Sequence, residues 1–152
     1  MLGRLYEGQN CSIARTLEVI GERWTALIIR DALLGHRRFD DFQASLGIAR
    51  NVLSDRLARL VAAGILDRVR YQDRPARWEY PITERGRELA VPLLALMQWG
   101  DRHLTGPAGP PRLVRHATCG AEVMQRHVCT YCGPVPGAEI AIEPGPGLEL
   151  AR

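Results

Sequence analysis

The middle of the chain repeats apolar residues at the spacing of an α-helix. From Arg50 to Ala63 they fall three or four positions apart, which places them on one face of a helix. The residues of this face are Leu53, Leu57, Leu60 and Val61. Gly64 follows directly, and glycine commonly ends a helix. The pattern therefore predicts an amphipathic helix that ends near Ala63.

A shorter segment with the same period precedes this helix. Phe39, Phe42 and Leu46 lie three and four residues apart, and Gly47 closes the segment. Two helices joined by so short a connection are typical of a helix-turn-helix, in which the second helix reads DNA.

After Gly64 the period changes from helical to extended. Residues 65–71 alternate between two faces, and an extended segment at 77–83 follows a turn that contains Pro75. This pattern predicts a two-stranded hairpin with Arg74 and Arg77 at its tip. Because a guanidinium group binds phosphate oxygens bidentately, we interpret the hairpin as a wing that holds the DNA backbone.

The second helix carries its polar side chains opposite the apolar face and on the flanks, mostly in its first two turns. Those turns contact base edges when a helix enters the major groove end-first. The helix and the wing together predict a DNA site that comprises Arg38, Arg50, Asn51, Ser54, Asp55, Arg56, Arg59, Arg74 and Arg77.

Positive charge is concentrated on this helix and hairpin. Residues 50–77 contain seven Arg and three Asp, a net charge of +4, whereas the whole chain carries +3 at pH 7. A field confined to one segment suits phosphate contact better than a diffuse excess. The alternative is a helix–hairpin domain that binds protein and whose arginines are merely solvated.

A series of motifs occurs in register between Cys11 and Leu104. They are the early Cys11, Gly21–Trp24 with an apolar helix after it, RRFDDF, the run Asn51–Leu57, AAGIL, WEYPIT and Trp99–Gly100. This set resembles the HxlR-type winged-helix transcriptional regulators. The resemblance implies a mainly α fold with a small β-hairpin wing, in a small homodimeric bacterial regulator that binds double-stranded DNA at a palindromic operator.

Two residues depart from the pattern of that family. Ala49 stands where such regulators tend to have a hydroxyl residue that caps the reading helix, so the start of this helix is expected to be less firmly held. Trp78 replaces a smaller aliphatic residue in the second wing strand and is expected to change the packing of the hairpin.

Further apolar helices flank the reading motif. Trp24–Leu34 is apolar on nearly every face, which predicts a buried central helix, and Ser12 is a candidate N-cap for the helix before it. Thr83 begins the last helix, which Pro92 is expected to kink. The apolar surface left over at both ends of the domain predicts a dimer interface; the alternative is that the terminal helix packs on its own domain.

Composition changes abruptly after Leu104. Residues 105–152 hold seven of the ten prolines and seven of the fifteen glycines, with TGPAGPP as an evident linker. We therefore expect a DNA-binding and dimerisation domain over residues 1–104, a linker over 105–112 and a small appendage over 113–152.

The appendage contains a pattern typical of zinc ligands. His116, Cys119, Cys129 and Cys132 follow H-x2-C-x9-C-x2-C, and a glycine follows each pair. Zinc binds four N and S ligands tetrahedrally, and a structural zinc ion would explain how so polar a segment folds. The alternatives are a disulfide or redox pair among the cysteines, or no site at all. His127 is a competing ligand.

Cys11 lies just before the first helix and outside this pattern. The amides at a helix N-terminus lower the pKa of a thiol and raise its reactivity. The family resemblance implies a cysteine here that senses oxidants or electrophiles; the alternative is an unreactive cysteine buried at the dimer interface.

Other classes of protein are disfavoured. No nucleophile elbow, phosphate loop or deaminase motif is present, and no stretch approaches the ~20 apolar residues of a membrane span. We therefore expect a cytoplasmic transcriptional regulator, not an enzyme, whose small-molecule effector is unknown. The alternative is an adaptor that uses the winged helix and the ribbon to bind protein rather than DNA.

Overall fold

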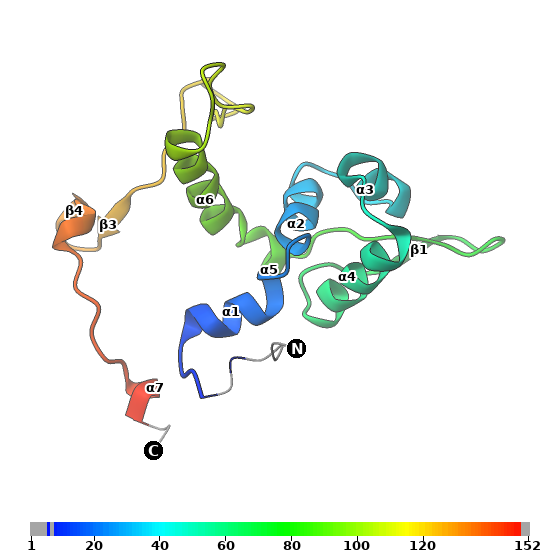
Figure 1. The fold of residues 1–152 in the computed structure, drawn as a ribbon, viewed down its shortest axis with the longest axis horizontal. Helices are drawn as coiled ribbons and strands as arrows, with labels where there is room; N and C mark the ends of the chain where they lie inside the picture. Colours follow the sequence, from blue (N-terminus) through cyan, green and yellow to red (C-terminus); the bar gives the residue numbers. More distant parts are fainter. Residues whose placement is uncertain (1–5, 7, 150–152) are drawn as a thin grey trace. The chain divides into compact units, whose positions relative to one another are not determined.

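The computed structural model describes residue 6 and residues 8–149, and the chain divides into two compact units, residues 1–90 and 91–152 (Figure 1). The first unit contains α1 (Ser12–Ile20), α2 (Thr25–Leu33), α3 (Phe39–Leu46), α4 (Arg50–Ala62), β1 (Val69–Gln72), β2 (Arg77–Glu79) and α5 (Glu84–Arg87). The second contains α6 (Ala90–His103), β3 (His127–Cys129), β4 (Gly133–Val135), a 3-10 turn (Gly137–Glu139) and α7 (Pro146–Glu149). This division groups α6 with the C-terminal segment, so the boundary expected after Leu104 stays a prediction.

The core of the first unit surrounds α2. No residue of α2 is exposed, as expected of a central helix, but Leu34, which was expected to belong to this buried helix, lies beyond its end and is exposed. The largest fully buried apolar side chains come from α2, α3, α4 and the segment after α4: Ile28, Ile29, Phe42, Leu53, Leu57, Leu60 and Leu66. The apolar stripe predicted for the reading helix thus faces this core, apart from the half-buried Val61.

Left-handed glycines end the two helices of the helix-turn-helix. Gly47 after α3 has φ +61°, and Gly64 after α4 has φ +69°. Both are conformations that favour glycine, because a Cβ atom would be strained there. The predicted positions at which α3 and α4 end are therefore confirmed.

The hairpin is antiparallel and is joined to the helical part at its base. Val69 pairs with Glu79 and Arg70 with Trp78, and an irregularity follows before Gln72 pairs with Arg77. Below the strands, Leu66 forms a bridge with Ile82. Figure 1 shows the hairpin extending beyond α3 and α4. The first unit is therefore mainly helical with one β-hairpin wing, as the sequence predicts.

Two expectations about helix ends are wrong. Cys11, not Ser12, is the N-cap of α1, and no side chain caps that helix. The last helix is not one kinked rod: it is interrupted at Glu88 and Leu89 between α5 and α6. Pro92 consequently lies in the first turn of α6, where proline is tolerated because its missing N–H has no intrahelical partner.

Thr83 caps α5 as expected. Its hydroxyl accepts a hydrogen bond from the Gly86 amide at 3.0 Å and donates to the Gly64 carbonyl oxygen at 2.7 Å. The same residue therefore ties the end of the wing to the end of α4. Among the described helices, none has the length and apolar character needed to span a membrane.

Candidate nucleic-acid interface

The outer face of α4 is exposed over its first two turns. Asn51, Ser54 and Asp55 are exposed in these turns and Arg59 is exposed in the last turn, whereas the opposite face is buried in the core. The helix begins at Arg50 after Ala49, whose backbone is extended and which provides no side-chain cap. The expected lack of a cap is therefore confirmed, and the first backbone amides of α4 lack a side-chain acceptor at this position.

Arg50 is held at the start of this face but stays open to solvent. Its guanidinium lies 4.7 Å from the centre of the Phe39 ring and donates to the Gln43 side chain at 2.8 Å. A longer ion pair of 3.4 Å joins it to Asp40. These contacts orient the guanidinium in advance. Because the side chain is still 67% exposed, the guanidinium remains available to a phosphate.

Arg59 is oriented by a pair within α4. Its Nε lies 2.9 Å from a carboxylate oxygen of Asp55, one turn earlier. Both side chains are at least 40% exposed, so the pair contributes little to stability. The ion pair instead orients Arg59, because it holds the guanidinium along the outer face of α4.

Arg56 differs from the other predicted contacts because its side chain is only 14% exposed. Its guanidinium binds Glu22, in the turn before α2, at 2.7 Å and Asp55 at 3.0 Å. Arg56 therefore fastens α4 to the segment before α2. Its predicted role as a DNA contact is not supported by this placement.

The wing has an aromatic residue between arginines. The guanidinium of Arg68 lies 4.0 Å from the centre of the Trp78 ring, and that of Arg70 lies 5.8 Å away. Arg70 also pairs with Asp73 at 3.2 Å near the turn. Trp78 therefore packs against arginine side chains, which is how this departure from the family pattern is accommodated.

Arg74 and Arg77 are exposed around the turn of the hairpin. Arg38 lies at its base, where the guanidinium is 4.8 Å from the centre of the Tyr71 ring and pairs with Glu79 at 3.3 Å. The wing thus carries exposed cations from its base to its tip, which suits contact along a phosphate backbone.

Arg68 and Arg70 were not among the predicted contacts. Alternation in the sequence places both on the same strand face, but only the register of the hairpin brings Trp78 opposite Arg70. The sequence feature that could have pointed to these two arginines is Trp78, an unusual residue for the second wing strand, which follows an arginine-rich first strand.

Cys11 is exposed at the start of α1. The nearby backbone amides of Ala14 and Ile13 hold the pKa of its thiol below the ordinary value of 9.0. The thiolate fraction at neutral pH is consequently raised, as expected for a cysteine at a helix N-terminus.

The predicted zinc ligands lie in two pairs. His116 Nδ1 is 3.2 Å from Cys119 Sγ, and backbone hydrogen bonds from Cys132 and Tyr131 lower the pKa of the Cys129 thiol. Within residues 6 and 8–149, no three His, Cys, Asp or Glu side chains gather at one point suited to a metal. The structure thus brings together the members of each pair but not the four residues.

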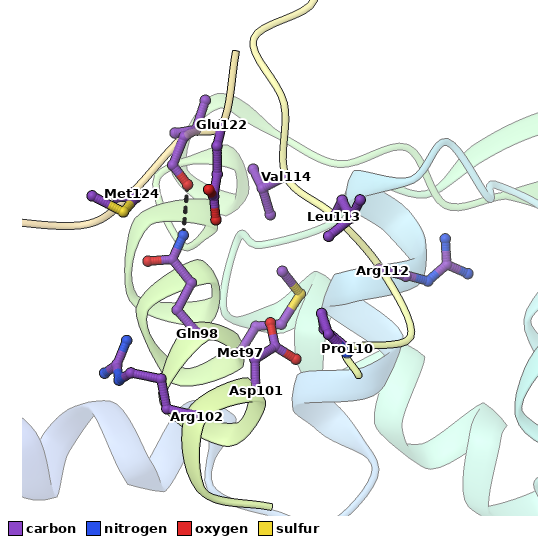
Figure 2. Close-up of a pocket in the computed structure, with 11 residues that line it drawn as sticks. Met97, Gln98, Asp101, Arg102, Pro110, Arg112, Leu113, Val114, Glu122 and Met124 are labelled. Carbon is purple, nitrogen blue, oxygen red and sulfur yellow. Dashed lines mark hydrogen bonds between the residues drawn. The ribbon is translucent and has the colours of Figure 1, made fainter. Parts of the chain in front are cut away.

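The segment that carries the first pair lies along α6 (Figure 2). Gln98 of α6 donates to the Val123 carbonyl oxygen at 2.7 Å, which is the dashed line in Figure 2. Its side-chain oxygen accepts from the Gln125 amide at 2.9 Å. A cavity of about 210 Å³ remains beside these bonds. Because drug-sized ligands occupy pockets of roughly 300–1,000 Å³, we assign no ligand to it.

Residues 19–107 match the family described as HxlR-like helix-turn-helix. The uncharacterized HTH-type transcriptional regulator Rv3095 of Mycobacterium tuberculosis is 47% identical over 149 residues, which cover 97% of this chain and 93% of that protein.

Two solved structures are similar to the fold. The crystal structure of PA1607, described as a candidate transcription factor, has a TM-score of 0.80 at 33% identity and covers 90% of this chain and 96% of that chain. The redox regulator HypR in its reduced form has a TM-score of 0.57 at 32% identity and covers 60% of this chain and 92% of that chain. The PA1607 match extends past residue 107, into the C-terminal segment.

Proposed function

The chain belongs to the HxlR-like helix-turn-helix family of DNA-binding transcriptional regulators, which are not enzymes, and we propose that it acts as a homodimer on a palindromic operator. In this proposal α4 of each subunit enters a major groove, and each wing lies on the flanking backbone. Two half-sites would then be separated by about one helical turn, 10–10.5 base pairs.

The observation that carries the proposal is the exposed outer face of α4 beside an arginine-bearing wing. Asn51 and Ser54 present hydrogen-bonding groups to solvent in the first turns of the helix, and Arg59 does so in its last turn. Arg50, Arg74 and Arg77 add exposed cations at its start and on the hairpin. These are the two classes of contact that a sequence-specific reader needs: groups that reach base edges and groups that bind phosphate.

Exposed apolar side chains support the dimer. On α1, Ile13, Leu17 and Val19 are exposed, and α6 has no buried residue. The exposed apolar side chains of α6 and its end are Val91, Leu96, Trp99 and Leu104. Exposed surface of this kind suits an interface between two copies, because solvent-exposed aliphatic and aromatic surface gains stability when it is covered.

Binding-site selection from a random duplex pool tests the proposal directly. We expect the purified protein to enrich a palindrome whose half-sites are about one helical turn apart. Enrichment of a single unpaired half-site would overturn the homodimer on DNA. A pool that stays random would favour the alternative of an adaptor that binds protein.

We further propose that Cys11 makes this regulator responsive to oxidants or electrophiles. The exposed thiol and its lowered pKa favour the reactive thiolate. With hydrogen peroxide the thiolate sulfur forms a bond to one oxygen while the O–O bond breaks, which yields a sulfenic acid and hydroxide. The redox regulator HypR, similar in fold, supports the proposal.

Replacing Cys11 with serine is expected to remove the response to peroxide. The untreated parent and Cys11→Ser proteins should bind the selected operator equally. After treatment, the parent should lose at least about tenfold in affinity, or about 1.4 kcal/mol, while the variant keeps its affinity. Fluorescence anisotropy with labelled operator measures both. An equal loss of operator affinity in the Cys11→Ser protein would show that Cys11 is not the sensor.

A further inference from the structure

The segment between α6 and the 3-10 turn contains two hairpins with the same construction. In the first, Arg115 forms an antiparallel bridge with Glu122, and the Val123 amide donates to the Val114 carbonyl oxygen at 3.0 Å. In the second, β3 pairs with β4, and Cys129 is opposite Gly133. Each hairpin therefore consists of a short antiparallel pair closed by a tight turn.

The two turns place potential metal ligands at equivalent positions. His116 and Cys119 lie in the first turn and are followed by Gly120, whose φ is +71°. Cys129 ends β3 directly before the second turn, and Cys132 lies in that turn and is followed by Gly133, whose φ is +79°. In both turns the left-handed glycine lets the chain reverse immediately after the second ligand.

The first turn holds its two potential ligand atoms close together, and the second turn directs a backbone amide at one of its sulfurs. His116 Nδ1 and Cys119 Sγ are 3.2 Å apart, and two such ligands on one tetrahedral zinc ion are about 3.6 Å apart, given Zn–N and Zn–S bonds of roughly 2.0–2.1 and 2.3 Å. In the second turn the Tyr131 amide donates to Cys129 Sγ at 3.5 Å. Amide donors of this kind stabilise a thiolate that binds metal.

The hairpins have no hydrophobic core to hold them. Every residue from 105 to 148 is exposed or half-buried, and the large apolar side chains Met124, Val128, Tyr131 and Ile142 are exposed. Segments of this size without a core commonly need a disulfide or a structural metal. None of the four cysteines is in a disulfide.

We propose that one Zn²⁺ ion binds His116, Cys119, Cys129 and Cys132, two ligands from each hairpin, and joins the hairpins into a zinc ribbon. Three sulfurs and one imidazole nitrogen are a donor set typical of tetrahedral structural zinc. The two pairs must approach each other to share the ion. Gln98 holds Val123 and Gln125 on α6, so the β3–β4 hairpin, which begins two residues later, is the part that moves.

Metal content and cobalt substitution test the site on the full-length protein. After purification under reducing conditions, we expect one zinc per chain by elemental analysis. Replacement by Co²⁺ should produce the visible absorption of a tetrahedral ion and the near-ultraviolet charge-transfer band of three thiolates. Less than half an equivalent of zinc with all thiols reduced would overturn the proposal, and so would a mass lower by two hydrogens that indicates a disulfide.

The chain offers matched controls for each kind of ligand. Cys119→Ser, Cys132→Ser and His116→Ala should each weaken zinc binding by at least about 100-fold, because loss of a direct ligand exceeds the 10–100-fold effect of removing an outer-shell partner. Cys11→Ser and His127→Ala should bind zinc like the parent in competition with a chromogenic chelator. Loss of binding in His127→Ala with retention in His116→Ala would overturn the assigned ligand set. Because the readout is metal affinity, it is independent of whether the protein binds an operator.

Discussion

Replacing Arg59 and Arg74 together with alanine is expected to abolish sequence-specific binding to the selected operator at physiological ionic strength. Arg59 lies on the outer face of α4 and Arg74 on the exposed turn of the wing, so the two substitutions remove contacts of different kinds. Loss of a base-contacting arginine costs about 1–3 kcal/mol, a factor of about 5 to 150, and a homodimer loses the contact twice. Titration of labelled operator in the same buffer measures the change.

The two single variants separate these contributions. Arg74→Ala should weaken binding to all duplexes similarly, because a phosphate contact carries no sequence information. The slope of log K against log salt falls by about 0.9 for each lost contact, hence by about 1.8 if two subunits bind. Arg59→Ala should instead relax the preference at one symmetric pair of operator positions.

Arg126→Ala is the charge-matched control. This arginine is exposed and lies outside the stretch 50–77 that carries the concentrated positive charge. It should leave affinity and salt slope close to those of the parent. If the double variant also kept parental affinity and slope, α4 and the wing would not be the DNA-binding surface.

Gly86→Ala is expected to destabilise the first unit strongly. Gly86 is buried in α5, and an added Cβ would lie 2.7 Å from Ile82 Cγ1 and nearer still to the Ile65 carbonyl oxygen. That oxygen also accepts a hydrogen bond from the Thr83 amide at 3.1 Å, which holds it in place. Overpacking costs about 1–3 kcal/mol, and the backbone contact places this variant at the upper end, about 3 kcal/mol.

Urea unfolding followed by circular dichroism measures the effect, and Gly100→Ala provides the control. Gly100 lies within α6, and a Cβ built there meets no atom within 4 Å. Replacing a helical glycine with alanine at such a position should stabilise the helix by roughly 0.5–1 kcal/mol. A Gly86→Ala protein as stable as the parent would show that the junction of α4, the wing and α5 is not tightly packed.

Local pattern was sufficient to predict most elements of the first unit. Gly47 and Gly64 marked the ends of α3 and α4, because the left-handed backbone at each position requires glycine. Thr83 marked the start of α5 through its cap. Two boundaries were not predicted: the N-cap of α1, which is Cys11 and not Ser12, and the interruption between α5 and α6 before Pro92. At both places the residue types do not distinguish one helix boundary from a neighbouring one.

Side-chain roles within the predicted site were less accessible from the sequence. Arg56 and Arg59 are three residues apart on the same helix and have equal charge, yet only Arg56 is nearly enclosed. The difference comes from Glu22, a partner 34 positions away in the chain. Helical periodicity places Arg56 on the flank of the apolar face and Arg59 opposite that face, but it carries no information about which distant residue packs against the flank.

The sequence by itself determined that this protein is a winged helix-turn-helix regulator, because period, glycine positions and charge concentration are local properties of the chain. Only the tertiary structure decided which arginines remain available to DNA and that Trp78 packs against Arg68 and Arg70 in the wing. It also placed the His and Cys residues of the C-terminal segment in two separate hairpins. Those outcomes depend on contacts and strand register between separate segments, and such contacts exist only once the chain has folded.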